Sequence, residues 1–448
     1  MNAGLTTLAL RSVRHRASAF TATFLTALLG SAMIGAFATQ VETAGGAVSD
    51  TDAEALTIMG AVVGSWGLVI VLFSVASTVG INTAQRAAEL GLVRTVGGTP
   101  RQVRRLVNRE TLAVTATGAL IGSVFAYVGG AVLLAAVRGA GMVDESVAYG
   151  GGPASVLAVA AGLVAVSLVA STVAARRATR GPARLVLAEA AAGTTRIRWW
   201  RVAGALLLVG YGVAGALVTV LVTKDSDDPY AAMQTSGSAS ILVGVGLAAL
   251  APVWLRLLGR LLPHGRVAAA PHLAVGNLRR RPQLLAGVLA PVIVLTASAT
   301  GVLMLVGIDG RTLDATLGDD DAELITMLNY VVTGMIVTFA AIMVVNGVAA
   351  MLSHRRAELT RLGLVGATPG QVRGSVLLEA GLVAAVGVGL GTVASAATVL
   401  PFAYARDEGW IPDGQLWTPV VIAAAAAALT VVSTRAVLRR TVPLPAAG

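Results

Sequence analysis

Two glutamates separated by the same interval occur twice in the chain, and they are the first residues to consider for specific chemistry. Glu89 and Glu110 form one pair, and Glu358 and Glu379 form the other. The other charged residues in the segments that contain them are arginines. Acids kept in both copies of a basic segment indicate a specific pairing rather than a solvated surface.

An internal repeat surrounds these acids. A shift of 269 positions aligns residues 86–110 with residues 355–379 without a gap, and 13 of the 25 aligned positions are identical. Chance gives only a few identities over this length. A fainter echo relates Leu8–Arg16 to Leu273–Arg281. The chain therefore contains two copies of one unit.

The repeated segment predicts a helix, a tight turn and a new short helix. An apolar residue recurs every three positions after the first acid, which suits a helix running on from the membrane with one apolar stripe: Leu90, Val93 and Val96, or Leu359, Leu362 and Val365. Gly97 and Gly366 can adopt the left-handed conformation that ends such a helix. A Thr-Pro-x-Gln sequence then matches a capping box with proline at the first helical position.

The new helix places valines on one face and leaves the rest of its surface free. Val103 and Val107 share the apolar face in the first copy, and Arg101, Arg104 and Arg105 make the remaining surface basic. One interpretation is a well-capped loop that merely returns the chain to the membrane. The interpretation we favour is a docking element, because a duplicated element suits a partner with twofold symmetry.

Other chemistry finds little support in the sequence. Cysteine is absent, and the four histidines show no metal-ligand spacing. No Gly-x-x-x-x-Gly-Lys-Ser/Thr loop occurs, and Lys224 is the only lysine. We therefore expect no catalytic residue, cofactor or metal in this chain. ATP hydrolysis, if it drives this protein, must come from another chain.

The composition indicates a membrane protein. Hydrophobic residues make up 56% of the chain and charged residues only 12%, with a mean hydropathy of +0.79. Ten charge-free stretches reach or approach the roughly 20 residues that cross a bilayer. They are 18–39, 60–81, 111–137, 153–175, 202–223, 237–255, 282–308, 324–353, 380–405 and 414–434. The scarcity of lysine beside arginine, with much Ala, Gly and Val, suggests a GC-rich bacterium and hence a bacterial cell membrane.

Charges in the connecting segments predict the orientation. All but four of the 33 Lys and Arg residues lie in the termini and in alternate loops, and 18 of the 23 acids lie in the other loops. The positive-inside rule places both termini and both repeated motifs in the cytoplasm. The basic surface is then a girdle at the membrane and not a nucleic-acid footprint.

The predicted fold is an all-α integral membrane protein with ten transmembrane helices. Two parallel four-helix repeats, residues 1–190 and 266–448, flank a two-helix insert at residues 191–265. Because the insert contributes an even number of crossings, the repeats share one orientation and are related by a pseudo-twofold axis along the membrane normal. The predicted external loops are short and leave no room for a folded external domain.

At these residues the sequence resembles the FtsX-like permease family, the membrane subunits of MacB-type ABC transporters. The pattern of an acid and Leu, a short helix, a Gly-Ala-Thr turn, Gln-Val and a further acid is matched at Glu89–Glu110 and at Glu358–Glu379. The ten-helix layout with two such units resembles the peptide-antibiotic resistance branch. Relatives often carry a large external domain after the first or seventh helix, whereas residues 40–56 and 309–323 are short loops here.

The resemblance implies a partner and a role for the repeated motif. The partner is an ABC ATPase that holds ATP and Mg, with two copies per chain, and membrane lipid surrounds the spans. The cargo would be an amphipathic peptide, a lipid or a hydrophobic drug. The implied ATPase-coupling residues are Glu89, Gly97, Gly98, Thr99, Pro100, Gln102 and Glu110, and Glu358, Gly366, Ala367, Thr368, Pro369, Gln371 and Glu379.

Two other classes of function stay open at this point. A carrier or channel that needs no ATPase usually keeps an ionisable residue at depth, and the ten predicted spans contain none. A signalling or scaffold subunit would need surface for a partner, and the external loops are short. Both features favour the ATPase-coupled permease.

Overall fold

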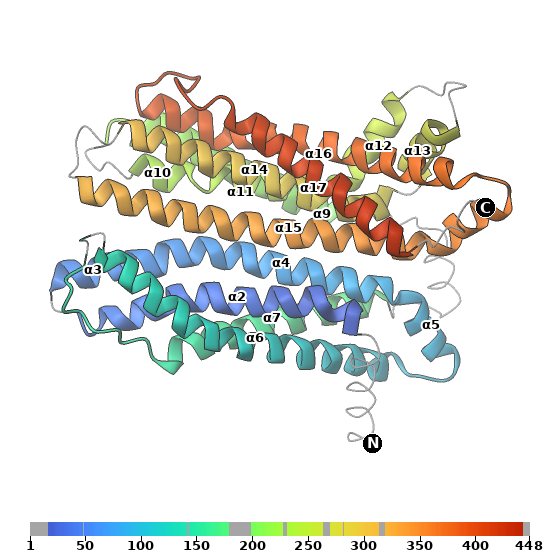
Figure 1. Ribbon diagram of the computed structural model, residues 1–448, viewed down its shortest axis with the longest axis horizontal. Helices are drawn as coiled ribbons and strands as arrows, with labels where there is room; N and C mark the ends of the chain where they lie inside the picture. Colours follow the sequence, from blue (N-terminus) through green and yellow to red (C-terminus); the bar gives the residue numbers. More distant parts are fainter. Residues whose placement is uncertain are drawn as a thin grey trace. The chain divides into compact units, whose positions relative to one another are not determined.

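The computed structural model describes residues 17–47, 49–139, 141, 143–178, 199–226, 231–262, 269–280, 282–312 and 319–441. All regular structure in these residues is helical (Figure 1). The prediction of an all-α protein is therefore confirmed for the described part of the chain.

Eight of the described helices are long and apolar enough to cross a membrane. They are Phe20–Ala44, Pro100–Gly139, Pro153–Arg176, Trp199–Thr223, Ala231–Ala249, Pro282–Thr312, Pro369–Ala405 and Thr418–Arg439. The other two predicted spans are also helical, in η1 (Met59–Val63) with α4 (Gly64–Gln85) and in α15 (Asp319–Leu364). The protein is a multi-pass membrane protein. The count of ten and the cytoplasmic termini stay predictions, and the N-terminal arginines lie outside the described residues.

The chain divides into two compact units, with the division inside α15 between Phe339 and Ala340. The first unit contains the helices α2 (Ala17–Ala44), α3 (Asp50–Ile58), η1, α4, α5 (Ala87–Thr95), α6 (Pro100–Gly139) and α7 (Pro153–Ala178). Within this unit α2 packs along α6, and α4 and α7 complete the bundle around α2. The apolar stretches 111–137 and 153–175 account for most of α6 and α7, and α6 also includes the charged residues 101–110.

The second unit is built around α14. It contains α9 (Trp199–Val218), η2 (Thr219–Thr223), α10 (Ala231–Ser236), α11 (Ala239–Ala249), α12 (Ala251–Leu261), α13 (Ala269–Arg280), α14 (Pro282–Thr312), α16 (Pro369–Ala405) and α17 (Thr418–Thr441), with the C-terminal part of α15. Helix α14 packs against α11, α16 and α17, and 89% of its most apolar stretch is buried. It forms the core of this unit.

The packing inside the two units follows the repeat. The pairs α2–α6, α6–α7 and α2–α7 in the first unit correspond to α14–α16, α16–α17 and α14–α17 in the second. In the sequence 111–137 shifts onto 380–406 in the same way. The three-part division at residues 190 and 265 stays a prediction, since the packing alone does not set those boundaries.

Three predicted element boundaries were wrong. The short helix expected after each turn is the first part of a longer one, because α6 and α16 run without interruption from Pro100 and Pro369 through the next span. No proline follows Pro100 or Pro369 before the apolar span in either copy, and α16 tolerates Gly370 and Gly374. The span predicted at 237–255 instead ends at Leu250, where the backbone turns before Pro252 in α12. In the first copy α4 does not run on, because Arg86 interrupts the helix before α5.

Glycines bring the helix pairs α2–α6 and α14–α16 into close contact. A Cβ added at Gly122 of α6 would collide with the carbonyl oxygen of Leu28 in α2. A Cβ added at Gly391 of α16 would collide with Thr296 in α14. The two glycines occupy equivalent positions under the repeat shift. They let helix backbones approach at a distance that no other residue permits.

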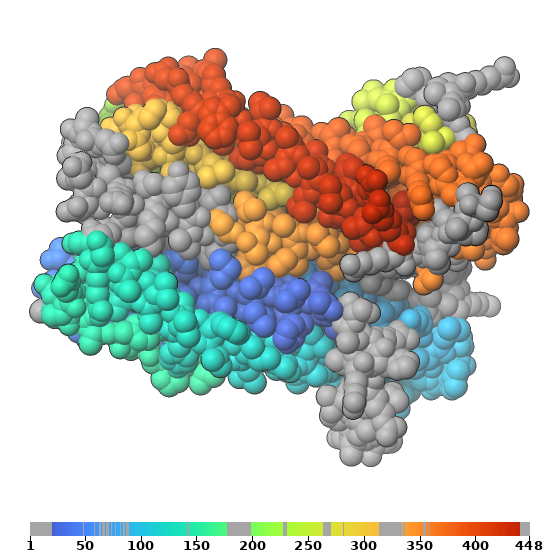
Figure 2. All heavy atoms as spheres, viewed as in Figure 1, coloured from blue at the N-terminus to red at the C-terminus, as the bar shows by residue number. Residues whose placement is uncertain are grey.

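A braced loop connects α16 and α17 at the end of the second unit opposite the turn before α16 (Figures 1 and 2). Glu408 accepts two hydrogen bonds of 3.0 Å from Arg311, and Arg406 donates to Asp309 at 2.7 Å. The rings of Tyr404 and Trp410 stack with centroids 4.7 Å apart. The loop presents four large apolar side chains to its surroundings: Trp410, Ile411, Leu416 and Trp417.

The corresponding loop of the first unit, between α6 and α7, differs in what it exposes. Its valines Val143 and Val147 are buried, and Asp144 and Glu145 are exposed. Glu42 of α2 accepts hydrogen bonds from the backbone of Gly152, at 2.6 Å, and from Ser155 at the start of α7. The loop after the outgoing helix therefore presents different chemistry in the two units.

Candidate functional site

The repeated motifs form two elbows, which we define as residues 86–110 and 355–379. In each elbow a glycine ends the incoming helix in the left-handed region, with φ of 102° at Gly97 and 98° at Gly366. The backbone N–H of Gly98 bonds to the carbonyl of Val93 at 3.0 Å, and Ala367 bonds to Leu362 at the same distance. This is the Schellman pattern of helix termination, and it confirms the predicted role of both glycines.

A capping box starts the outgoing helix in both elbows. The side chain of Gln102 accepts from the backbone of Thr99 at 2.8 Å, and the Thr99 hydroxyl accepts from the backbone of Gln102 at 3.3 Å. Thr368 and Gln371 repeat these bonds at 2.9 Å and 3.3 Å. Pro100 and Pro369 begin α6 and α16, where a missing N–H costs nothing. The predicted turn geometry is confirmed in both copies.

A buried ion pair ties the root of the first elbow together. Arg86 donates to both carboxylate oxygens of Glu110, which has no exposed side-chain surface. Glu89 lies 3.6 Å from the Arg86 Nε and is about half exposed. Burial acts to lower the pKa of Arg86, but the hydrogen bonds and charges of Glu110 and Glu89 outweigh it, so the pKa of Arg86 is raised above its ordinary value.

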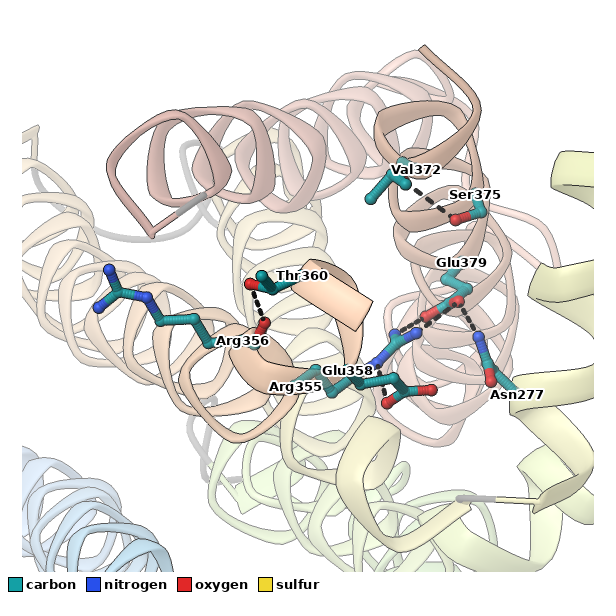
Figure 3. Close-up of polar contacts among 8 residues, drawn as sticks. All are labelled: Asn277, Arg355, Arg356, Glu358, Thr360, Val372, Ser375 and Glu379. Atoms are coloured by element: carbon teal, nitrogen blue, oxygen red, sulfur yellow. Dashed lines mark hydrogen bonds and ion pairs between the residues drawn. The ribbon is translucent and has the colours of Figure 1, made fainter. Parts of the chain in front are cut away.

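The second elbow repeats this pair and adds an amide (Figure 3). Arg355 donates to both oxygens of the buried Glu379, and Glu358 lies 3.6 Å from the Arg355 Nε. Asn277 of α13 donates to Glu379 at 2.6 Å. Helix α13 thus contributes directly to the root of the second elbow.

The burial of Glu110 and Glu379 limits what they can do. Neither carboxylate reaches the surface, so both hold the start of α6 and α16 against the incoming arginine instead of facing a partner. Glu89 and Glu358 are partly exposed and lie beside the same arginines. The specific pairing expected from the sequence is present, and its partners are Arg86 and Arg355.

The tips of the elbows expose apolar side chains, which the sequence reasoning did not anticipate. Val96 is 90% exposed and Val365 is 87% exposed, directly before the left-handed glycines. The period of three had placed both valines on one packed stripe. Only Leu90 and Leu359 at the start of that stripe are buried, and Leu90 packs against Val103, Val107 and Ala175. A bulky apolar residue directly before a helix-ending glycine was the available signal.

The roots of the two elbows differ in their surroundings. A small pocket beside the first ion pair is lined in part by Asn82, Thr83 and Thr111. The residues at the same repeat positions in the second unit are Met351, Leu352 and Ala380, and all three are buried. The arginine side chain is 13% exposed in the first elbow and 3% exposed in the second. The first pair therefore has three polar neighbours where the second has apolar ones, although Asn277 also bonds to Glu379 in the second root.

Within the described residues, no group of three or more His, Asp or Glu side chains is placed to hold a metal ion. Each elbow combines a fixed backbone turn, an exposed apolar tip and a root held by a buried ion pair. The structure thus defines a multi-pass helical membrane protein that carries one such elbow in each of two related units.

Comparison with protein families identifies the class more narrowly. The model of the FtsX-like permease C-terminal domain matches residues 61–183 and again residues 330–442, which together exceed half of the chain. The chain belongs to the FtsX-like permease family. The two matches begin 269 positions apart, the same shift that relates the elbows. A comparison with curated proteins finds no match.

Membership of this family defines the chain as a membrane subunit of the ABC-transporter permease type. Such subunits are generally not catalytic themselves and generally work with an ABC ATPase partner. Each family match contains one complete elbow and the three helices around it.

Proposed function

We propose that this protein is the permease subunit of a MacB-type ABC transporter in a bacterial cytoplasmic membrane. A separate ATPase dimer hydrolyses ATP with Mg and pushes on the two elbows from the cytoplasm. The motion drives the removal of an amphipathic or hydrophobic substrate, such as a peptide antibiotic, a lipid or a drug, from the membrane. Both termini lie in the cytoplasm, and two ATPase copies serve one chain.

The observation that carries this proposal is the matched geometry of the elbows. Both have the same left-handed glycine, the same capping box and an almost fully exposed valine at the tip. Apolar side chains that a fixed turn holds almost fully exposed are candidates for burial against a partner. Two such anchors in one chain suit a partner that itself has twofold symmetry.

The roots of the elbows connect the tips to the helices of the next predicted spans, so a force on the tips can reach those helices. The ion pairs Arg86–Glu110 and Arg355–Glu379 fasten the incoming segment to the outgoing helix. The outgoing helices α6 and α16 continue through the next predicted span without interruption. A force on the tip is therefore delivered to a rigid helix and not absorbed by a flexible loop.

The test is a search for the motor followed by substitution of the tips. Each ABC ATPase subunit encoded in the source genome is co-expressed with the full chain, and ATP hydrolysis is measured with the purified complex in nanodiscs. We expect one ATPase to co-purify and to be stimulated by the chain. Val96→Asp and Val365→Asp should each weaken its binding by about tenfold or more, because a charge replaces an apolar side chain that the ATPase is proposed to bury.

A matched control uses the other end of the first unit. Ala148→Asp adds the same charge at an exposed position of the loop between α6 and α7, and binding of the ATPase should stay unchanged. The proposal is wrong if no ATPase is stimulated by the chain. It is also wrong if the ATPase binds the two tip variants as tightly as the native protein.

The cargo is tested separately. Reconstituted vesicles with the ATPase outside and fluorescent amphipathic peptide in the bilayer should lose membrane-bound peptide when ATP and Mg are added. Loss of peptide without nucleotide would instead favour a carrier that needs no motor.

A further inference from the structure

Helix α12 of the second unit has an apolar stripe on its exposed side. Val253, Leu257 and Leu261 are all exposed, and Leu261 is exposed by 72%. Because these residues are spaced four apart, they lie on one face of the helix. Leu255 and Gly259 on the opposite face are buried. The helix therefore packs on the protein with one side and leaves an apolar stripe uncovered on the other.

Arginines and a tryptophan border this stripe. Arg256 and Arg260, four residues apart, lie along one edge of it, and Arg260 is exposed. Trp254 lies along the other edge and donates from its ring nitrogen to the carbonyl of Leu247 at 3.2 Å. Neither α12 nor the neighbouring α13 contains an acid. This arrangement is typical of helices that lie at the interface between lipid and water, beside anionic headgroups.

The first end of α12 lies at the predicted boundary of the membrane. Helix α11 ends at Ala249, and Arg201 donates to the Ala249 carbonyl at 2.8 Å. Arg201 directly precedes the span predicted at 202–223 and follows two exposed tryptophans, Trp199 and Trp200. Arginine and tryptophan are the residues that mark this boundary in membrane helices. The start of α12 is therefore level with the end of a span.

The other end of α12 is held at the same boundary. Arg279 of α13 donates to the carbonyl of Gly259 and, at 2.7 Å, to that of Leu262. Asn277 of α13 donates at 2.6 Å to Glu379, which directly precedes the span predicted to begin at residue 380. Figure 1 shows α12 and α13 together at the end of the second unit that carries the turn before α16. A helix of 11 residues, about 16 Å long, with both ends at the boundary lies along the membrane surface.

We propose that α12 is a binding site for anionic phospholipid in the leaflet on the side of the elbows. Its apolar stripe lies among the acyl chains, about 5–10 Å deep, and Arg260 binds the lipid phosphate. Because Arg279 joins α12 to α13, bound lipid steadies the helix whose Asn277 supports the root of the second elbow. The inference goes beyond the proposed function and needs no ATPase, so either can fail without the other.

The first experiment measures where α12 lies. The chain contains no cysteine, so a spin label on Leu261→Cys reports on this position alone in the full protein in nanodiscs. We expect the label to be more accessible to oxygen, which concentrates in lipid, than to a nickel complex dissolved in the water. The matched control is Leu364→Cys at the tip of the second elbow, where the native side chain is 83% exposed. The label on this control should be more accessible to nickel than to oxygen.

The second experiment measures hydrogen exchange in nanodiscs of phosphatidylcholine with and without phosphatidylglycerol. The anionic lipid should slow exchange of the amides of residues 255–262 by about fivefold or more, because binding stabilises the bound helix. Arg260→Ala should remove about half of this slowing or more. Arg435→Ala, which removes an exposed charge from the end of α17, should leave the slowing unchanged. Inorganic phosphate added to phosphatidylcholine nanodiscs should not replace the lipid.

The same measurement tests the connection to the elbow. In the native chain the slowing should extend from α12 to residues 271–280 of α13, since Arg279 bonds to the end of α12. In Arg279→Ala the slowing should be confined to α12.

Four outcomes would overturn the proposal. A label at position 261 that is as accessible to nickel as the label at position 364 would place α12 in water. A label shielded from both reagents would show that protein covers the stripe. Exchange that is unchanged by phosphatidylglycerol, or slowed equally in Arg260→Ala, would exclude the phosphate site. Exchange in α13 that does not follow α12 would remove the connection to the second elbow.

Discussion

Burial of a carboxylate at the root of each elbow is the most demanding feature at the scale of single residues. Glu110 and Glu379 have no exposed surface and each accepts two hydrogen bonds from an arginine. A buried charge is tolerated only when it is paired and hydrogen-bonded, and removing one partner leaves the other uncompensated. We therefore expect that loss of either partner in a pair disrupts the geometry of that elbow.

Replacement of Glu379 by glutamine should destabilise the second unit strongly. The change leaves the buried Arg355 with only the partly exposed Glu358 as a counter-charge, and we expect a loss of about 3 kcal/mol of unfolding free energy. Unfolding of the purified protein in detergent, followed by circular dichroism, measures the change. Glu358→Gln is the control, because Glu358 is partly exposed and should cost less than about 1 kcal/mol.

The double change Arg355→Met with Glu379→Met removes both charges and should recover most of the stability. Glu110→Gln should cost less than Glu379→Gln, because the first pair adjoins a polar pocket. Equal losses for the two glutamate variants would contradict the difference between the two roots.

The left-handed glycines give a second residue-scale prediction. Gly366→Ala places a Cβ in a conformation that costs about 1–2 kcal/mol. Open space surrounds the position, so strain of the backbone is the sole penalty. Limited proteolysis should cut the elbow of the variant faster than that of the native chain. Gly370→Ala, four residues later in α16, should show no such increase.

At this scale the sequence identified the acids but not their partners. Repetition of Glu110 and Glu379 in a basic segment indicated a specific pairing. Arg86 and Arg355 were identical in both copies, yet nothing local brings together residues 24 positions apart. The exposure of Val96 could not be predicted from the sequence. A period of three predicts an apolar stripe on a helix, but it does not show which residues of the stripe are buried.

The element that differs most between the units is the helix leading into each elbow. Helix α15 continues to Leu364, whereas α4 ends at Gln85 and a single residue, Arg86, separates it from α5. Short helices have only marginal stability unless tertiary packing stabilises them. The nine-residue α5 depends on Leu90 and on the root pair for that support.

Hydrogen exchange should report this difference. Backbone amides of residues 87–95 should exchange at least about tenfold faster than those of residues 356–364, because an interrupted short helix opens locally at lower free energy. Exchange followed by mass spectrometry in nanodiscs resolves both segments. Equal protection of the two segments would show that Arg86 does not act as a break.

Helix existence was predictable at this scale, and helix ends were less so. Apolar length located the spans, and Gly-x-Thr-Pro located both turns. Fusion of the short helix to the span was missed because charged residues at 101–110 looked like the end of an element. Arginines on an exposed face and a neutralised Glu110 are compatible with one continuous helix.

For the whole molecule, composition and charge distribution were the strongest signals. A chain with 12% charged residues and ten long apolar stretches has few alternatives to a helical membrane protein. The repeat shift of 269 residues reappears in the packing pairs and in the two family matches. The asymmetry at the end away from the elbows was not predictable, because exposure there depends on which loop is braced by ion pairs.

That braced loop supports a prediction about the membrane. Trp410 and Trp417 both precede α17 and are exposed, and tryptophan favours the interface between lipid and water. In variants that keep only one of these tryptophans, dibrominated phosphatidylcholine should quench about half of the emission or more. Acrylamide in the water should quench little. The reverse pattern would place the loop in water or against another protein.

The close glycine contacts of the long helices bear on the direction of movement. Gly122 of α6 lies against α2 with 22 residues of its helix before it and 17 after it, and Gly391 of α16 lies against α14 with 22 before it and 14 after it. The part of the helix on the elbow side is therefore about 33 Å long, and the part on the far side about 21–26 Å. If each helix tilts about this contact, an inward displacement of the tip would move the far end outward by a smaller distance.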